Sequence, residues 1–296
     1  MRAQNEETDF LADLLQCAKA VMDTFGVRYS DVSDDHKIVE RWANLQLKLI
    51  RMAPRRVHKS ARLLSRTIPT ETTEALVLVE KKCTGGRDLN PHLTKRLLRP
   101  DATDYLFADW AIHHLHLSTQ MDGPTFMKRS GQLLFAIFTE VDAYFIDIRP
   151  HGQNYVFAQK ELLETVHDEW PHLLRPFRLQ GVVDISPSID NPKRIHIMRR
   201  AGLMLMHKCR DAVYTPMGGG MTTAATSARV VDEVDRLYQT VSAVEAHTRS
   251  NLNEMKTRIR EATGAPPTTI DLHLELTDNG FFVVDRASGL GFPIQP

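Results

Sequence analysis

The sequence is short of cysteine, of long apolar runs and of any leader-like segment, and each absence argues against a class of protein. Cys17, Cys83 and Cys209 are scattered through 296 residues, so neither a disulfide framework nor a cysteine zinc site is indicated. No apolar run approaches the roughly 20 residues that cross a bilayer. The polar stretch at 1–7 lacks the apolar core of a signal peptide. We therefore expect a cytoplasmic protein without a membrane partner.

Acidic residues are missing from two stretches of a chain whose formal net charge is zero. Residues 41–66 contain eight Lys or Arg and residues 193–210 contain six, and neither stretch has an acid. Such basic blocks suit contact with a phosphate backbone, and RNA is the partner that we expect. The alternative is a surface that faces water or that acids elsewhere in the chain neutralise. The predicted nucleic-acid-binding residues of the first block are Arg55, Arg56, Lys59 and Arg62.

Residues 1–86 are expected to form a mainly helical region with a basic surface. Apolar residues recur at helical spacing in 8–25 and 34–52, and Gly26 follows the first of these segments. The Ala-Pro pair at 53–54 would break the second helix before a basic helix at 55–65. A further helix is predicted at 70–82.

Residues 87–214 are expected to form a mixed, β-rich core. The segment DWAIHHLHLS at 109–118 predicts a strand that carries three histidines. The apolar runs at 132–138 and 143–148, joined by an acidic turn, predict a β-hairpin, and 160–170 predicts a helix. Residues 179–206 are ambiguous, with one or two strands and then a helix after Arg199 and Arg200.

Residues 215–296 begin with a Gly-rich segment at 215–227 that predicts a linker or mobile loop. A valine and leucine seam then predicts one continuous helix over 228–262, which would bury the seam against the core, a partner protein or a second copy of the chain. Alternation at 270–276 and the Asn-Gly pair at 279–280 predict a terminal hairpin. Together the three regions predict an α+β fold.

The core concentrates side chains that are suited to acid–base chemistry. His114 and His116 share one face of the predicted strand, because side chains alternate along a strand. His151 follows the end of a neighbouring strand, in a Pro-His-Gly turn that would aim it at a cleft. Either of the first two histidines with His151 would form an acid–base pair for RNA cleavage, and Arg129 would clamp the phosphate. Tyr144 completes the set of candidate catalytic residues.

Two other interpretations of these residues stay open at this point. His114, His116 and His151, or Asp147 in place of the last, would supply the three ligands of an open metal site. Alternatively, the histidines satisfy backbone groups in the core and carry no chemistry.

Five segments of the chain resemble a group of poorly characterised bacterial and phage-associated proteins. They are GRDLNPHLT at 86–94, DWAIHHLHL at 109–117, RSGQLLFA at 129–136, PHG at 150–152 and EWP at 169–171. Histidine and arginine on adjacent strands also resemble the small ribonuclease fold of RelE-type toxins and barnase. This resemblance implies a compact nuclease core to which the helical front and the C-terminal region are additions.

The sequence therefore predicts a metal-independent endoribonuclease that needs no cofactor and has a toxin-like or phage-defence role. The first alternative is a metal-dependent hydrolase that uses the histidine ligands. The second is a non-enzymatic module that binds nucleic acid or protein through the basic block and the 228–262 helix.

Overall fold

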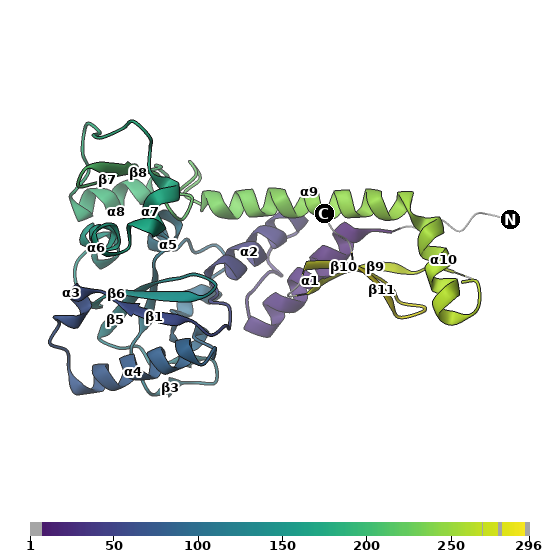
Figure 1. Ribbon diagram of the computed structural model, residues 1–296, viewed down its shortest axis with the longest axis horizontal. Helices are drawn as coiled ribbons and strands as arrows, with labels where there is room; N and C mark the ends of the chain where they lie inside the picture. The colour runs from purple at the N-terminus through teal and green to yellow at the C-terminus, as the bar shows by residue number, and fades with distance from the viewer. Residues whose placement is uncertain (1–7, 268, 278–279, 294–296) are drawn as a thin grey trace. The chain divides into compact units, whose positions relative to one another are not determined.

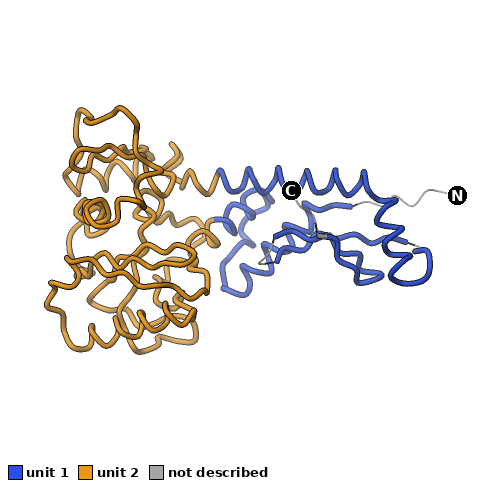
Figure 2. The backbone as a smooth tube through the Cα atoms, in the orientation of Figure 1, with its two compact units in different colours: residues 1–43, 232–296 blue, residues 44–231 orange. Residues whose placement is uncertain are grey.

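The computed structural model describes residues 8–267, 269–277 and 280–293. The chain divides into two compact units, one made of residues up to 43 and from 232 onward, the other of 44–231 (Figure 2). This division differs from the three regions expected from the sequence, because the two ends of the chain pack together. The buried Asp13 of the first helix accepts a hydrogen bond from the backbone N–H of Leu274 at 2.8 Å.

The larger unit is built on a four-stranded sheet with the order β1-β6-β5-β2. β1 runs parallel to β6, and the other neighbours are antiparallel. The hairpin formed by β5 and β6 confirms the prediction for 132–148. The strands are β1 (Arg56–Lys59), β2 (His113–His116), β5 (Gln132–Phe138) and β6 (Asp142–Pro150).

Both faces of this sheet are covered, which explains why its two central strands are apolar along most of their length. Tyr144 and Ile146 of β6 belong to a buried cluster with Leu162 and Val166 of α6 (Glu161–Glu169). α4 (Thr70–Thr84) lies on the opposite side of the sheet from α6 (Figure 1).

Short elements connect the sheet to its surroundings. The helices are α3 (Ala61–Leu64), η1 (Asn90–His92), η2 (Lys95–Leu98), α5 (Tyr105–Trp110), η3 (Val156–Ala158), α7 (Pro171–Leu174), η4 (Arg175–Phe177) and α8 (Pro192–Arg200). The strands outside the main sheet pair as β3 (Met121–Asp122) with β4 (Phe126–Met127), and β7 (His207–Cys209) with β8 (Ala212–Tyr214).

The smaller unit combines helices with a three-stranded antiparallel sheet. The terminal hairpin is confirmed, with a third strand after it, whereas Asn279 of its predicted turn lies outside the described residues. The elements are α1 (Phe10–Phe25), most of α2 (Asp35–Lys48), most of α9 (Ala228–Ser250), α10 (Leu252–Thr263), β9 (Leu272–Thr277), β10 (Gly280–Asp285) and β11 (Leu290–Pro293). With both helices and sheets in the chain, the fold class is α+β as predicted.

The predicted basic helix at 55–65 is wrong for its first half. Residues 56–59 form strand β1, and only 61–64 are helical, in α3. Ser60 separates the two elements, because its hydroxyl accepts a hydrogen bond from Leu63 N–H at 2.9 Å and so caps α3. The backbone of β1 forms its hydrogen bonds with β6 instead of within a helix. The basic composition of the stretch gives no sign of this distant pairing.

The predicted histidine strand is shorter than 109–118. Asp104 accepts hydrogen bonds from the N–H groups of Leu106 and Phe107, both at 3.1 Å, and thereby starts α5. Helix α5 continues to Trp110, so Asp109 and Trp110 are helical and the strand begins at His113.

The Gly-rich segment at 215–227 is packed against α5 and is not a free linker. Gly218 N–H donates to Asp109 O at 3.1 Å, and Gly220 N–H donates to Ala108 O at 2.8 Å. A Cβ atom on Gly218 would lie 2.1 Å from Phe107 O, so only glycine allows this approach.

The helix predicted over 228–262 is two helices, because the chain leaves helical geometry at Asn251. Its side-chain amide donates to His247 O at 2.8 Å, which is the local competition with backbone bonding that disfavours asparagine inside helices. Val241 and Val244 of the seam are buried within the single chain. Association through this seam remains a prediction.

The ambiguous segment at 179–206 also differs from expectation. The helix in it, α8, ends at Arg200 instead of beginning there. Asn191 caps its start by accepting from Lys193 N–H at 2.9 Å, and Pro192 occupies the first helical position, where its lack of an N–H costs nothing. None of the helices among the described residues is both long and apolar enough to cross a membrane.

Candidate functional site

A cavity of about 530 Å³ lies within the larger unit, beside the edge strand β2. Its size falls in the range of about 300–1,000 Å³ that is usual for ligand pockets. Strand β2 contributes His114, the segment around the hairpin contributes Arg129 and His151, and α8 contributes His196, Arg199 and Arg200. The cavity therefore joins side chains from parts of the chain that are far apart in sequence.

His114 faces a carboxylate across the cavity wall. It lies on β2 opposite Phe135 of β5, and its Nδ1 atom is 3.5 Å from Oδ2 of Asp104. That Nδ1 atom is buried and makes no hydrogen bond to the described residues. The same Asp104 side chain caps α5, so the helix start fixes the carboxylate that faces the histidine.

His151 is held by an arginine. Its backbone N–H donates to Gly131 O at 2.9 Å, directly after β6 ends. Nη2 of Arg129 lies 3.1 Å from Nε2 of His151, and a guanidinium only donates hydrogen bonds. The histidine nitrogen therefore accepts and the ring is neutral. Burial first, and then the positive charges of Arg129 and His114, lower the pKa of His151 below its ordinary value.

The ring of His116 packs against the ring of His151. The two rings stack with centroids 5.6 Å apart, but His116 is not among the residues that line the cavity. Burial is the largest cause that lowers the pKa of His116 to about 4, and neighbouring His114, His151 and Arg129 act in the same direction. A neutral ring stacked on His151 suits positioning of the ring better than proton transfer.

Positive charge dominates the cavity lining. Five cationic side chains line it, and Asp104 is the one carboxylate among the lining residues. Burial lowers the pKa of Lys48 to about 8, and its ammonium donates to Ala102 O at 2.5 Å. Such an environment attracts anions, because a low dielectric constant strengthens the attraction between each cation and an anion. The five cations are Lys48, Arg96, Arg129, Arg199 and Arg200.

The sequence predicted only part of this site. His114, His151 and Arg129 do converge on one cavity, and His116 is next to it. Tyr144 lies elsewhere, since its hydroxyl is 3.1 Å from Nε2 of His172 and its ring stacks on His58.

The α8 residues were missed as part of the site. The acid-free block at 193–210 was the only signal for them. That signal gave no reason to place α8 beside the histidine strand.

Each of the four cations predicted to bind nucleic acid contacts another group of the protein, although Arg56 and Arg62 are exposed. Arg55 is buried and donates to Thr139 O at 2.6 Å. Arg56 pairs with Asp142 at 2.9 Å, and Lys59 pairs with Glu80 at 2.6 Å. Arg62 donates to the Thr165 hydroxyl at 3.1 Å. Acids neutralise Arg56 and Lys59, which favours the alternative interpretation for these two residues. Binding of RNA at this surface remains a prediction.

The histidines are not arranged as metal ligands. Within the described residues, no group of three or more His, Cys, Asp or Glu side chains could hold a metal ion. His116 and His151 stack face to face, so their nitrogens do not converge on one point. The geometry gives no support to the metal-dependent alternative.

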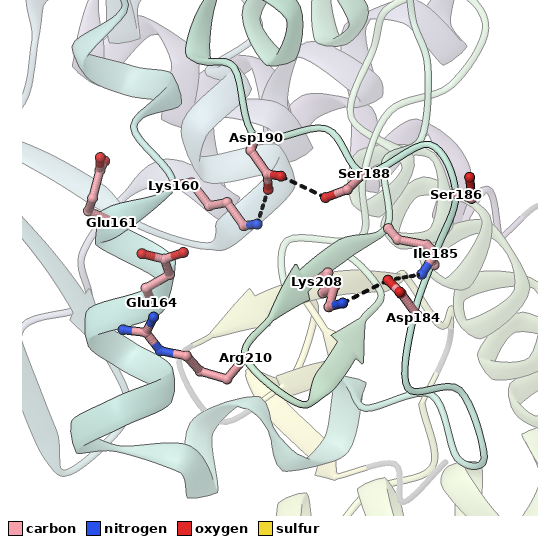
Figure 3. A pocket seen from close by; sticks show the side chains of 10 residues that line it. All are labelled: Lys160, Glu161, Glu164, Asp184, Ile185, Ser186, Ser188, Asp190, Lys208 and Arg210. Carbon is pink, nitrogen blue, oxygen red and sulfur yellow. Dashed lines mark hydrogen bonds and ion pairs between the residues drawn. The ribbon is translucent and has the colours of Figure 1, made fainter.

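A second pocket of about 580 Å³ has a different character (Figure 3). Lys160 contacts Asp190, which also accepts from the Ser188 hydroxyl at 2.8 Å, and Lys208 pairs with Asp184 at 2.8 Å. Because its lysines are paired with acids, this pocket has no excess charge comparable to that of the histidine cavity.

Comparison of the chain with protein-family models, with curated proteins and with solved structures gives no match. The site must therefore be interpreted from its own geometry.

Stability should fall in mild acid because of the buried histidines. Burial is the main cause that lowers the pKa values of His92, His113 and His116 to about 4 each, against about 6.5 in an unfolded chain. Between these values the unfolded state binds more protons, so the free energy of unfolding decreases as the pH falls.

His113 offers the clearest test of this effect. It packs between Phe107 and Phe138, and neither ring nitrogen has a hydrogen-bond partner in the described part of the chain. His113→Leu should reduce the loss of unfolding free energy between pH 7 and pH 5 by on the order of 1–2 kcal/mol. Denaturant unfolding at the two pH values measures it, with the exposed His247→Leu as control. An unchanged pH dependence in His113→Leu would contradict the assignment.

Proposed function

We propose that the histidine cavity cleaves the phosphodiester backbone of RNA, with its own side chains as acid, base and phosphate clamp. The observation that carries the proposal is the pairing of each histidine with a different partner in one cationic cavity. His114 faces the Asp104 carboxylate, whereas His151 accepts from the Arg129 guanidinium. An acid–base pair requires two proton-transfer groups at one site, and these two histidines lie in different surroundings of one cavity.

His151 suits the role of general base. Its ring is neutral, and its lowered pKa keeps it so near neutral pH. A bound phosphate would compete for the Arg129 guanidinium, because charge-assisted bonds to phosphate are stronger than bonds to a neutral ring. This competition would free Nε2 of His151 to take the proton of the ribose 2′-OH.

We assign the role of general acid to His114, which lines the same cavity as His151 and whose Nδ1 atom lies 3.5 Å from Oδ2 of Asp104. The 2′-oxygen attacks phosphorus while the bond from phosphorus to the 5′-oxygen breaks. His114 donates its proton to that leaving oxygen. Arg129 stabilises the additional negative charge on the phosphoryl oxygens. The products are a 2′,3′-cyclic phosphate and a free 5′-hydroxyl, and one proton has moved from the 2′-OH to the leaving group.

Substitution of either histidine should abolish most of the activity. We expect His114→Ala and His151→Ala each to lower the cleavage rate of an oligoribonucleotide by about a hundredfold or more, since each removes a proton-transfer group. His116→Ala should have a smaller effect, because its ring touches His151 and not the cavity. A fluorogenic oligoribonucleotide measures the rates.

Tyr144→Phe is the matched control, because that side chain lies away from the cavity. It should retain the wild-type rate. Full activity in both His114→Ala and His151→Ala, with their fold intact by circular dichroism, would disprove the proposal.

The pH profile should report the contact between Arg129 and His151. A base must be neutral to act, so kcat/KM should rise with pH through a midpoint below the ordinary histidine value of about 6.5. Arg129→Gln removes one of the charges that lower this pKa. We expect a lower rate in this variant and, separately, a midpoint shifted to higher pH. A lower rate with an unmoved midpoint would show that His151 is not the base.

A further inference from the structure

Arg199 presents an unusual buried charge at the edge of the cavity. Its side chain is only 2% exposed, yet it lines the cavity. Nε donates to Asp109 Oδ2 at 2.7 Å and Nη1 donates to Phe157 O at 2.7 Å. The guanidinium also lies over the Trp110 ring, 4.1 Å from its centroid. Three contacts thus fix the orientation of the group.

One nitrogen of this guanidinium is left without a partner. Nη2 is buried and makes no hydrogen bond to the described residues. A buried donor of a charged group that stays unsatisfied is costly, and proteins usually avoid it. Because Arg199 borders a cavity, a ligand acceptor in that cavity is the simplest way to satisfy the bond. An anion is the acceptor that suits a cation best.

Two more α8 side chains face the same space. His196 and Arg200 are four residues apart, so they lie on one side of the helix, and both line the cavity. Burial and the charges of Arg200 and Arg199 lower the pKa of His196. The α8 wall therefore offers the cavity Arg200 and the unpartnered Nη2 of Arg199, and it is built separately from the pair formed by Arg129 and His151.

We propose that Arg199 and Arg200 form a second phosphate subsite, which binds a phosphate next to the one that is cleaved. The ligand would then be an oligonucleotide with at least two phosphates, and a single phosphodiester would fill the cavity only in part. The identity of the first phosphate rests on the proposed cleavage of RNA. Binding of the second phosphate does not require cleavage.

The test uses ligands that lack the 2′-OH and therefore cannot react by the proposed route. Isothermal titration compares a deoxydinucleotide with one phosphodiester against the same dinucleotide bearing an added 5′-phosphate or an added 3′-phosphate. We expect one of the two added phosphates to tighten binding to the wild-type protein by about tenfold, the gain expected from a charge-assisted contact. Equal affinity for all three ligands would overturn the subsite.

Variants assign the gain to α8. Arg200→Ala removes an exposed side chain, so the fold should be kept, and most of the tenfold gain should disappear. Arg199→Lys keeps a charge near Asp109 but removes Nη2, and should have the same effect. Arg194→Ala is the matched control, because it is an exposed arginine of α8 that does not line the cavity. It should retain the gain.

A gain that persists in folded Arg200→Ala and in Arg199→Lys would also overturn the subsite. Thermal unfolding of each variant shows whether its fold is kept. If the wild-type protein shows the phosphate gain but leaves RNA intact, the subsite stands and the cleavage proposal falls. If the wild-type protein cleaves RNA but binds the ligands with an added phosphate no more tightly, the cleavage proposal stands and the subsite falls.

Discussion

Three segments that are distant in sequence meet at the buried carboxylate of Asp109, at the end of α5. Arg199 of α8 donates to it at 2.7 Å, and Nε2 of His207 on β7 lies 2.9 Å from it. Burial opposes the charge of Asp109, but His207 and Arg199 outweigh that effect and lower its pKa. Removal of one partner would strand a buried charge, which usually costs about 3–5 kcal/mol. This pairing therefore holds α8 against the core and makes Arg199 part of the cavity wall.

The histidines of the site are positioned by the edge strand β2 and its neighbours in the sheet. Its backbone pairs with β5 through His114 and His116, so the hairpin of β5 and β6 sets the position of both rings. His151 follows directly after β6, which brings it against His116. Strand register thus places the stacked pair, and the start of α5 places the carboxylate that faces His114. The arginines of α8 and of the segment before β5 supply the charge.

The sequence predicted what local patterning encodes. Helices α1 and α4, the hairpin and the terminal strands follow from periodicity and caps, and the Pro-His-Gly turn pointed to His151. Tertiary pairing determined the rest. Strand β1 looks like a basic helix because its parallel partner, β6, lies more than 80 residues away in the chain. Contacts between distant segments also place the Tyr144 hydroxyl beside His172 instead of in the cavity. The role of Arg199 likewise depends on Asp109, a buried acid 90 positions earlier in the chain.

We propose that the cavity activates a ribose 2′-OH against the adjacent phosphate. The most direct measurement incubates the purified protein with an RNA and with the DNA of the same sequence, in the presence of EDTA. Mass spectrometry then identifies the ends of the products. Our account predicts that the RNA is cleaved to fragments with 2′,3′-cyclic phosphate and 5′-hydroxyl ends while the DNA remains intact. Intact RNA, cleavage of the DNA, or RNA fragments that end in a 3′-hydroxyl would contradict it.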